Sequence, residues 1–560
     1  MSVSITTWGL RHRAVSHTRS KWQASAQFRR NIAKATGMHV EQHKQSAAAT
    51  SAQTPKQALQ TQRRAGICMH ISALPGDNGI GELGAAAHAF VDTLADAGCS
   101  VWQFLPTGPT AYGDSPYQPL SAYAGNPMLI AMDELVALDL LPTDALAPLH
   151  ALPQDHTDYG QLIPLKSALL DRAALAFADN REHPLQPAFA RFIDEAQTPW
   201  LRDYALFRTL KTLHDERPWP QWPAAYRQRD AAALAQVERA HHTQIHAVRF
   251  AQFMFYRQWQ ALQTHAARSG VLLFGDMPIY IALDCADAWA NHAMLRLDAD
   301  GIPDAVAGVP PDYFSADGQL WGNPLYDWDY HRQTGFNWWI ARMQHTLSMV
   351  DIVRIDHFRG FEAYWAVPFG AQTAREGAWE PGPADALFDA IRAALGELLI
   401  VAEDLGAITP AVDELRLRQR MPGMSVLQFM VNDPDFDADR ISNDSVVYTG
   451  THDNDTTLGW FRGGVGDVRT EAQIHNDQRL TLQQTGGDGS DVHWRLLQMA
   501  LQCAACIAIV PMQDVLGLDS AARFNTPGNP GDNWRWRMPA GAFASEVREQ
   551  LHAEIRSSGR

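Results

Sequence analysis

Three short acidic strings, each directly after a short β-like run, constrain the fold of this chain most. They are Arg354-Ile355-Asp356-His357, Glu403-Asp404-Leu405-Gly406 and Thr451-His452-Asp453-Asn454-Asp455. A carboxylate just past a buried strand lies at the C-terminal end of that strand. In a parallel barrel these ends meet at one mouth, where catalytic groups collect. Several carboxylates in one mouth suit cleavage of a glycosidic bond, which needs one ionised and one protonated partner.

Strand-like and helix-like segments alternate from residue 65 onward. The strands are expected at 66–71, 101–105, 271–276, 351–353, 398–402, 445–448 and 507–510, and the helices between them include 85–97, 338–349 and 383–395. Such alternation predicts parallel βα units. A (β/α)8 TIM barrel fits better than an open sheet, because candidate functional residues follow many strands rather than one switch point.

The domain prediction is a catalytic barrel over residues 63–545 that carries two insertions. The first, about 133–262, is rich in Ala, Leu and Trp and is expected to be a helical subdomain; the second, about 284–345, is expected to be a lid or loop. Residues 546–560 are set apart as a C-terminal tail.

Residues 1–62 differ from the rest of the chain. The first 60 residues hold nine Lys or Arg and one acid, with little apolar periodicity, which predicts a disordered extension. The segment also resembles an organelle transit peptide, but we favour an upstream extension without a role, with Met38 as a possible true start. The expected location is therefore the cytoplasm, with a plastid as the alternative.

Charge and cysteine content exclude several classes of partner. The formal net charge of −16 disfavours nucleic acid, and no apolar run reaches the roughly 18–20 residues that span a bilayer. Five cysteines indicate a reducing compartment. Cys503 and Cys506 have the CxxC spacing, but they lie in an apolar run without a second pair, so we interpret them as core residues.

Gly79-Ile80-Gly81-Glu82-Leu83-Gly84 matches the GxGxxG motif of dinucleotide-binding proteins. That site would need an acid near the end of the next strand, but residues 101–105 are followed by Pro-Thr-Gly. We therefore interpret the motif as a tight strand-to-helix turn.

Arg354 and Asp356 are two residues apart, so their side chains point to the same side of a strand. Arg354 is expected to lower the pKa of Asp356 and keep it ionised, as a nucleophile toward an anomeric carbon requires. The structural alternative is an Arg–Asp pair that caps a strand. Glu403 follows an apolar run, which raises the pKa of a carboxyl group and suits a general acid. Its neighbour Asp404 is the rival, and only one of the two can face the site.

His452-Asp453 also matches the metal-binding HD pair of phosphohydrolases, but no further His residues stand at ligand spacing. We prefer His452 as a neutral hydrogen-bonding group for sugar hydroxyls and Asp453 as a second, non-nucleophilic carboxylate. Asp455 is the rival for the role of Asp453.

Two Gly- and Pro-rich loops carry aromatic and polar side chains suited to sugar contact. The first holds Tyr112, Asp114, Ser115 and Tyr117, and the second holds Tyr313, Phe314, Trp321 and Asn323. Ordinary turns with packed aromatic rings are the alternative. The second loop is expected to act as a lid that keeps water out.

Together these strings resemble the 4-α-glucanotransferases (amylomaltases, or disproportionating enzymes) of glycoside hydrolase family 77. The resemblance runs from about Gly66 to Arg537. The strings that carry it are the three acidic strings with Leu74-Pro75-Gly76, Gly108 to Gln118, Gly125-Asn126-Pro127, Gly275 to Tyr280, Gly308 to Phe314, Trp321-Gly322-Asn323-Pro324, Asn525-Thr526-Pro527-Gly528 and Asn533-Trp534.

The resemblance implies a (β/α)8 barrel with helical insertions and no separate C-terminal β-domain. It implies that Asp356 is the nucleophile, Glu403 the acid/base and Asp453 the stabiliser of the transition state, supported by Arg354 and His452. Asp276, Ser115, Tyr117, Trp321 and Asn323 would contact glucose units, and Tyr313 and Phe314 would belong to a mobile loop. The implied partners are an α-1,4-glucan donor and a glucose or glucan acceptor, with no cofactor, no metal, no nucleic acid and no membrane, in a monomer or homodimer. The alternatives are an α-amylase-like hydrolase and a catalytically idle glucan-binding scaffold.

Overall fold

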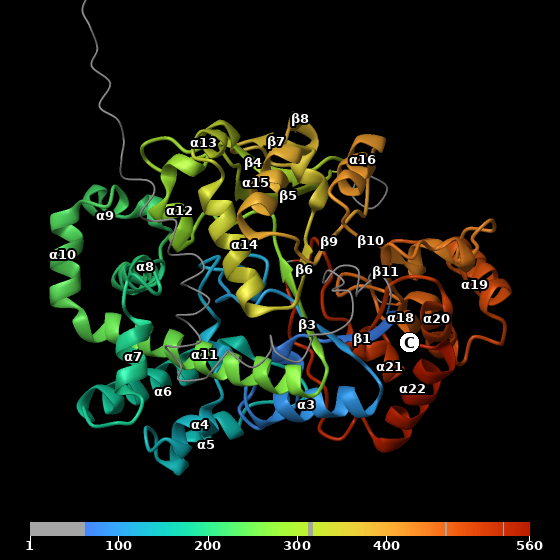
Figure 1. Ribbon diagram of the computed structural model, residues 1–560, viewed down its shortest axis with the longest axis horizontal. Helices are drawn as coiled ribbons and strands as arrows, with labels where there is room; N and C mark the ends of the chain where they lie inside the picture. Colours follow the sequence, from blue (N-terminus) through green and yellow to red (C-terminus); the bar gives the residue numbers. More distant parts are fainter. Residues whose placement is uncertain (1–61, 312–316, 465–466, 530) are drawn as a thin grey trace, which may run out of the picture.

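Eight parallel strands form the centre of the molecule (Figure 1). The structure is a computed structural model that describes residues 62–311, 317–464, 467–529 and 531–560. The strands are β1 (Arg64–Cys68), β2 (Val101–Gln103), β3 (Leu272–Met277), β6 (Ile352–Ile355), β9 (Ile400–Ala402), β10 (Gly423–Val426), β11 (Ser445–Tyr448) and β12 (Ile507–Pro511). They pair in chain order from β1 to β9 and from β10 to β12, and β12 returns to β1, so that β9 and β10 are the two edges. The N–H of Ala402 donates to the carbonyl oxygen of Pro422, just before β10, at 2.9 Å. The sheet is thus a nearly closed barrel, and the predicted (β/α)8 fold is confirmed.

Apolar side chains from every strand fill the barrel. The interior cluster contains Cys68, Val101, Phe274, Ile352, Val401, Met424, Val426, Val446, Tyr448, Cys506, Ile507 and Ile509. Alternate residues of each strand point inward, so the interior is a packed core rather than a channel. Cys506 is part of this core, and all five cysteines are buried and unpaired, in agreement with the packing interpretation of the CxxC spacing.

Helices connect the strands around the outside of the barrel. In chain order they are α3 (Ala85–Asp96), α11 (His242–Arg268), α14 (Asn337–Met349), α15 (Asp385–Leu395), α16 (Pro410–Arg418), the single turn α17 (Leu427–Met430), α18 (Thr457–Arg462), α19 (Glu471–Thr485), α20 (Val492–Gln502), α21 (Met512–Val515) and α22 (Ser545–Ser558). Residues 546–560, treated as a tail from the sequence, therefore lie mostly in α22, whose Leu551 and Ile555 are buried.

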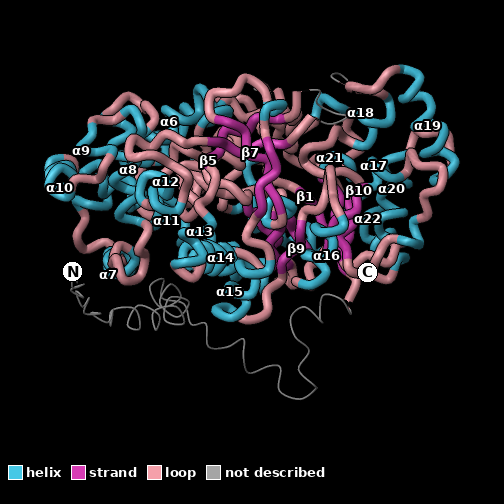
Figure 2. Tube along the Cα trace, turned by 90° about the horizontal axis from the view of Figure 1, so that it is seen from above, coloured by secondary structure: helices cyan, strands magenta, loops and turns pink. Residues whose placement is uncertain are grey.

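The insertion between β2 and α11 is helical. It contains α4 (Met132–Ala137), α5 (Ala147–His150), α6 (Tyr159–Asp179), α7 (Gln186–Phe192), α8 (Leu201–Leu213), α9 (Ala224–Arg227) and α10 (Ala231–Ala240). A second core, with Phe207, Trp219 and Trp222 among its members, packs α8 and α10 against the short helix α12 (Ala286–Ala290). In Figures 1 and 2 this insertion and α18 to α20 lie on opposite sides of the barrel.

A small antiparallel sheet grows out of the loops after β3 and β6. Its order is β5 (Gln319–Pro324), β4 (Ala305–Val309), β7 (Ala363–Pro368) and β8 (Ala378–Pro381). Only a lid or loop was expected over 284–345 from the sequence, so this sheet and the helix α13 (Trp328–Gln333) are additions. The sheet matters for the site because β5 carries Trp321 and Asn323.

The GxGxxG motif forms a packed turn before α3, as expected from the sequence. A Cβ at Gly81 would lie 1.9 Å from the carbonyl oxygen of Ile71, and Gly79 has a φ of +74°. Glycine is needed here for close backbone approach and for a left-handed conformation.

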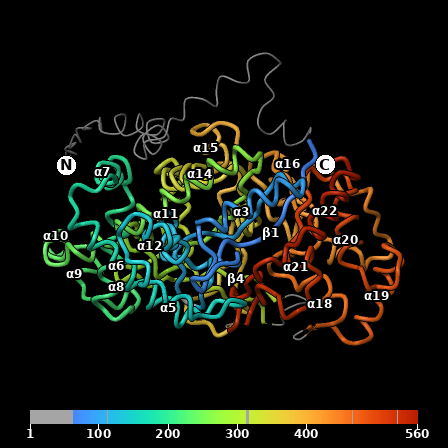
Figure 3. Tube along the Cα trace, turned by 90° about the horizontal axis from the view of Figure 1, so that it is seen from below, coloured from blue at the N-terminus to red at the C-terminus, as the bar shows by residue number. Residues whose placement is uncertain are grey.

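Both ends of the described chain lie near each other in Figure 3, where β1 runs beside α22. The predictions for residues 1–61, including the transit peptide, lie outside the described residues. No helix within the described ranges is both long and apolar enough to cross a membrane.

Candidate active site

Three neighbouring strands deliver charged side chains to one end of the barrel. Asp276 in β3 is in register with Arg354 in β6. Asp356 and Glu403 directly follow β6 and β9, and the strand pairing continues through them: the N–H of Asp356 donates to Met277 and that of Glu403 to Ile355, both at 3.0 Å. These groups lie close together because the C-terminal ends of parallel barrel strands meet at one mouth.

Arg354 is a buried cation held between two carboxylates. Its Nη1 donates to Asp276 Oδ2 at 2.6 Å and lies 3.0 Å from Asp356 Oδ1. The side chains of Arg354 and Asp276 are 4% and 0% exposed, whereas that of Asp356 is 28% exposed. Asp356 is thus the member of this group that faces the open end.

The pKa of Asp356 corrects one expectation from the sequence. Burial raises the pKa of this carboxyl to about 8, and Arg354 acts in the opposite direction without cancelling it; Asp276 and Glu403 add to the rise. The ion pair exists as expected, but Arg354 is shared with Asp276 and burial is the larger effect. Two nearby acids with raised pKa values hold one proton between them over part of the pH range.

Glu403 faces the same end of the barrel as Asp356. Its carboxylate accepts hydrogen bonds from the N–H of His357 at 2.7 Å and of Leu405 at 2.9 Å. Burial raises its pKa, which is the direction that the preceding apolar run predicts. Its rival Asp404 points elsewhere, because its carboxylate pairs with Arg416 at 3.0 Å and accepts the N–H of Met424 at 2.7 Å.

The turn at His357 explains how Glu403 is held beside Asp356. His357 has a φ of +52°, a left-handed conformation that costs a non-glycine residue about 1–3 kcal/mol. This turn aims the N–H of His357 at Glu403. The imidazole ring of His357 lies edge-on to the ring of Trp321, with ring centres 4.8 Å apart. Backbone strain of this kind collects at functional sites.

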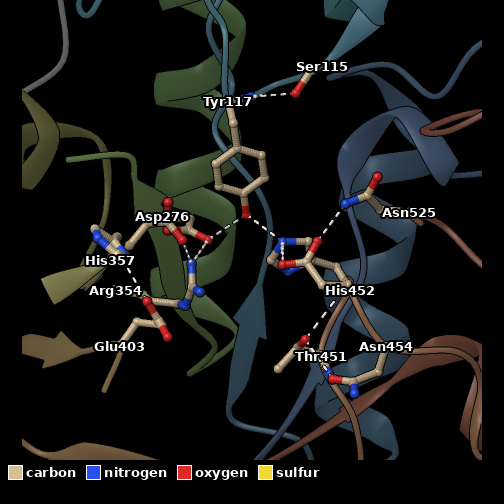
Figure 4. A network of polar contacts seen from close by, with 12 residues as sticks. Ser115, Tyr117, Asp276, Arg354, His357, Glu403, Thr451, His452, Asn454 and Asn525 are labelled. Carbon is tan, nitrogen blue, oxygen red and sulfur yellow. Dashed lines mark hydrogen bonds and ion pairs between the residues drawn. The ribbon is translucent and has the colours of Figure 1, made fainter. Parts of the chain in front are cut away.

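Tyr117 joins the two sides of the site, as Figure 4 shows. Its hydroxyl donates to Asp276 Oδ2 at 2.8 Å, so it accepts the hydrogen bond from Nε2 of His452, also at 2.8 Å. Burial lowers the pKa of His452, which favours the neutral imidazole expected from the sequence. Polar contacts therefore run without a break from Asp356 through Arg354 and Asp276 to Tyr117 and His452.

Asp453 stands at the far end of this network. Its Oδ2 lies 3.4 Å from Nε2 of His452, and its side chain is 43% exposed. Asn525 donates to its Oδ1 at 2.5 Å. The rival Asp455 is engaged by the hydroxyl of Ser520 at 2.6 Å. Asn525 belongs to one of the strings that carry the family resemblance, but no role was expected for it; its position after the last barrel strand is the signal that could have indicated one.

The first loop contributes unevenly. The hydroxyl of Ser115 accepts the N–H of Tyr117 at 3.2 Å, and Asp114 is partly buried with a φ of +56°. Of Tyr112 only the backbone is described. Tyr313 and Phe314, expected in the lid, lie outside the described residues. The indole N–H of Trp321 donates to Gln319.

Asn323, expected to contact glucose, has its amide group engaged by the protein. It exchanges two hydrogen bonds with the amide of Gln118, at 3.0 and 3.3 Å, and donates to the carbonyl of Ile281 at 2.9 Å. Because Asn323 is buried, these bonds tie β5 to the loop that carries Tyr117.

Replacing Asn323 with alanine is expected to lower the free energy of unfolding by about 1–3 kcal/mol, because Gln118 and Ile281 lose their partner in a buried place. Chemical denaturation of the single and double variants measures the coupling. Adding Gln118→Ala should cost less in the Asn323→Ala background than in the wild type. Equal losses of unfolding free energy in both backgrounds would mean that Asn323 and Gln118 do not stabilise each other.

The arrangement offers two carboxyl groups with raised pKa values on adjacent strands and a third across the mouth. This set can perform nucleophilic attack and acid/base catalysis at an acetal carbon. The described residues contain no group of three or more His, Cys, Asp or Glu side chains placed to hold a metal ion.

Comparisons with known proteins point to one family for the chain as a whole. The family model described as 4-alpha-glucanotransferase (glycoside hydrolase 77) matches residues 69–543. The 4-alpha-glucanotransferase of Synechocystis sp. is 45% identical over 85% of this chain and 94% of its own, and that of Thermus thermophilus is 42% identical over 90% and 100%. The amylomaltase of Streptococcus agalactiae in complex with acarbose superimposes with a TM-score of 0.84 at 34% identity, covering 89% of this chain and 100% of its own.

Proposed function

Because this chain belongs to glycoside hydrolase family 77, the 4-alpha-glucanotransferases, we propose that it transfers segments of an α-1,4-glucan to the 4-hydroxyl of another glucan or of glucose. We propose a double displacement with net retention of configuration. The observation that carries this proposal is the continuous polar network from Asp356 to His452, with Asp453 next to His452 and Glu403 beside Asp356.

The first displacement breaks the donor's glycosidic bond. Asp356 attacks the anomeric carbon while Glu403 gives its proton to the departing oxygen, so a covalent β-glucosyl ester forms and the shortened glucan leaves. In the second displacement Glu403 takes the proton of the acceptor's 4-hydroxyl, and that oxygen displaces Asp356. Two inversions give net retention. This mechanism requires the two carboxyl groups to be about 5–5.5 Å apart.

The remaining polar groups would support the transition state. The partly exposed carboxylate of Asp453 accepts hydrogen bonds from hydroxyl groups of the sugar whose ring distorts. Arg354 holds Asp356 in its attacking position. Neutral His452 has its Nε2 proton committed to Tyr117, which fixes the ring next to Asp453. The N–H groups of His357 and Leu405 each donate to one oxygen of Glu403, and these bonds hold the carboxyl group in place while its O–H donates to the leaving oxygen.

Transfer rather than hydrolysis depends on keeping water out while the acceptor enters. We propose that the second loop identified in the sequence, which carries Trp321, is the lid; the ring of Trp321 contacts that of His357. We further propose barrel and insertion boundaries at 63–545, about 133–262 and about 284–345, a monomer or homodimer, and a cytoplasmic location, or a plastid one if residues 1–62 are a transit peptide.

Incubation with maltotriose separates the possible activities. A transferase produces glucose together with a ladder of longer maltooligosaccharides at constant reducing-end concentration. A hydrolase raises the reducing-end concentration steadily, and a binding scaffold changes nothing. Either of the last two results overturns the proposal. Chromatography of the products with a parallel reducing-sugar assay gives the answer.

A further inference from the structure

Arg523 contacts two of the loops that build the mouth of the barrel. It follows the 3-10 turn η10 (Ser520–Ala522) after β12. Its Nη2 donates to the carbonyl oxygen of Asp453 at 2.8 Å, and its Nε donates to the carbonyl oxygen of Asn525 at 2.7 Å. One guanidinium group therefore holds the backbone of the loop after β11 and that of the loop after β12.

A third hydrogen bond closes this arrangement into a ring. The amide of Asn525 donates to Oδ1 of Asp453 at 2.5 Å. Asn525 is 8% exposed, whereas the side chain of Asp453 is 43% exposed. The partly exposed carboxylate of Asp453 is thus held by the amide of Asn525. The length of this hydrogen bond depends on Arg523, because Arg523 binds the backbone carbonyl groups of both residues.

The geometry suits arginine in particular. Its fork presents two N–H groups in one plane, so it can hold two carbonyl oxygens at once, whereas lysine is a flexible point charge. Arg523 also acts on Asp455 and Asp467, whose pKa values its charge lowers. Its side-chain hydrogen bonds among the described residues, however, are made to backbone carbonyl groups. The guanidinium group therefore fixes the position of the two loops directly.

We propose that Arg523 is a positioning residue for catalysis, which acts by holding Asp453 and Asn525 in register. This inference rests on the proposed function, because it takes Asp453 to act on the reacting sugar. Loss of Arg523 would let the two loops separate and loosen the hydrogen bond from Asn525 to Asp453. A misplacement of about 1 Å in a catalytic group can cost about 100-fold in rate.

The expected result is a fall in kcat of about 100-fold for Arg523→Gln with maltotriose, much larger than any change in KM. The kcat of Arg523→Lys should lie between that of Arg523→Gln and that of the wild type, since lysine can keep one of the two carbonyl contacts. Arg495→Gln is the matched control: Arg495 also bonds a carbonyl, that of Thr485, and an acid, Asp491, but on α19 and α20 outside the site. It should leave kcat unchanged.

A double-mutant cycle distinguishes positioning from a general loss of structure. The affinity for acarbose, measured by calorimetry, should fall on Arg523→Gln in the wild-type background but not in the Asp453→Asn background, because the effect passes through Asp453. Equal losses in both backgrounds, or unchanged kcat in Arg523→Gln, would overturn the proposal. If Arg523→Gln does not fold, the same cycle with Arg523→Lys decides.

Failure of the proposed function gives a different result. If the wild type hydrolyses maltotriose without transfer, the proposed activity is wrong, yet the acarbose cycle still tests Arg523, since it needs no turnover. If the wild type transfers normally and the cycle shows no coupling, the transferase stands and the positioning role of Arg523 is wrong.

Discussion

Asp356→Asn is expected to abolish glucan transfer, with a loss of about 10⁴–10⁶-fold, the scale seen when a member of a nucleophilic catalytic unit is replaced. The amide cannot form the glycosyl ester, although it fills the same space. Initial rates of glucose release from maltotriose measure the loss. A variant that transfers within tenfold of the wild type would contradict the role of Asp356.

The fold should survive this change. Arg354 keeps its 2.6 Å ion pair with Asp276, so no buried cation is left alone. Burial raises the pKa of Asp356 to about 8, so the folded protein holds this proton more tightly than the unfolded chain does. The stability that this group contributes is therefore complete below the pKa of an unfolded carboxyl, about 4, and is lost as the pH rises through about 8.

Thermal unfolding tests that sign. At pH 9 the wild type carries an ionised, poorly solvated carboxylate that the asparagine variant lacks, so the variant should melt at the same temperature or higher. At pH 4 it should show no such gain. The difference in melting temperature, Asp356→Asn minus wild type, should therefore be larger at pH 9 than at pH 4. A smaller difference at pH 9 would contradict the raised pKa of Asp356.

A matched control lies at the opposite end of the same strand. Asp351 precedes β6 and accepts the N–H of Leu273 at 2.9 Å, away from the mouth. Asp351→Asn should retain the transfer activity of the wild type. A slow fluorinated glycosyl donor offers a direct test, because mass spectrometry should find the added sugar on the peptide that contains residue 356 and on no other.

Sequence patterns predicted the barrel because its strands are short apolar runs separated by amphipathic helices. β10 was not anticipated: its Gly423-Met424-Ser425-Val426 has a glycine and a serine and no apolar run. The antiparallel sheet was also missed, since β5 contains glycine and proline and resembles a loop. Pairing with a distant strand, rather than local propensity, determines such segments.

The charged residues at the strand ends could be placed from sequence because every parallel strand of a barrel ends at the same mouth. The contacts between them could not. Tyr117 meets Asp276 and His452 only because a loop after β2 folds across the barrel, and the amide of Asn323 turns to Gln118, 205 residues away in the chain. The net pKa of Asp356 depends on burial, which no local pattern reports.

Glu403→Gln is expected to lower transfer from maltotriose by about 10²–10⁴-fold, the usual contribution of general acid catalysis. The loss should nearly vanish in the first displacement when the donor is a maltosyl fluoride, because fluoride leaves without protonation. Comparing the two donors by release of glucose and of fluoride therefore isolates the proton transfer from any damage to the site. A similar loss with both donors in the initial burst of product, before the second displacement limits the rate, would contradict the acid role.

Asp404→Asn provides the control for Glu403→Gln, because its carboxylate faces Arg416 and Met424. Any loss that it causes should be equal for maltotriose and for the fluoride donor. The pH profile with the fluoride donor adds a second reading. Glu403 raises the pKa of Asp356, so its neutral replacement should let Asp356 ionise at lower pH and move the acidic limb of the profile downward. An acidic limb that stays in place would mean that the two carboxyl groups titrate independently, and one proton would not be shared between nucleophile and acid.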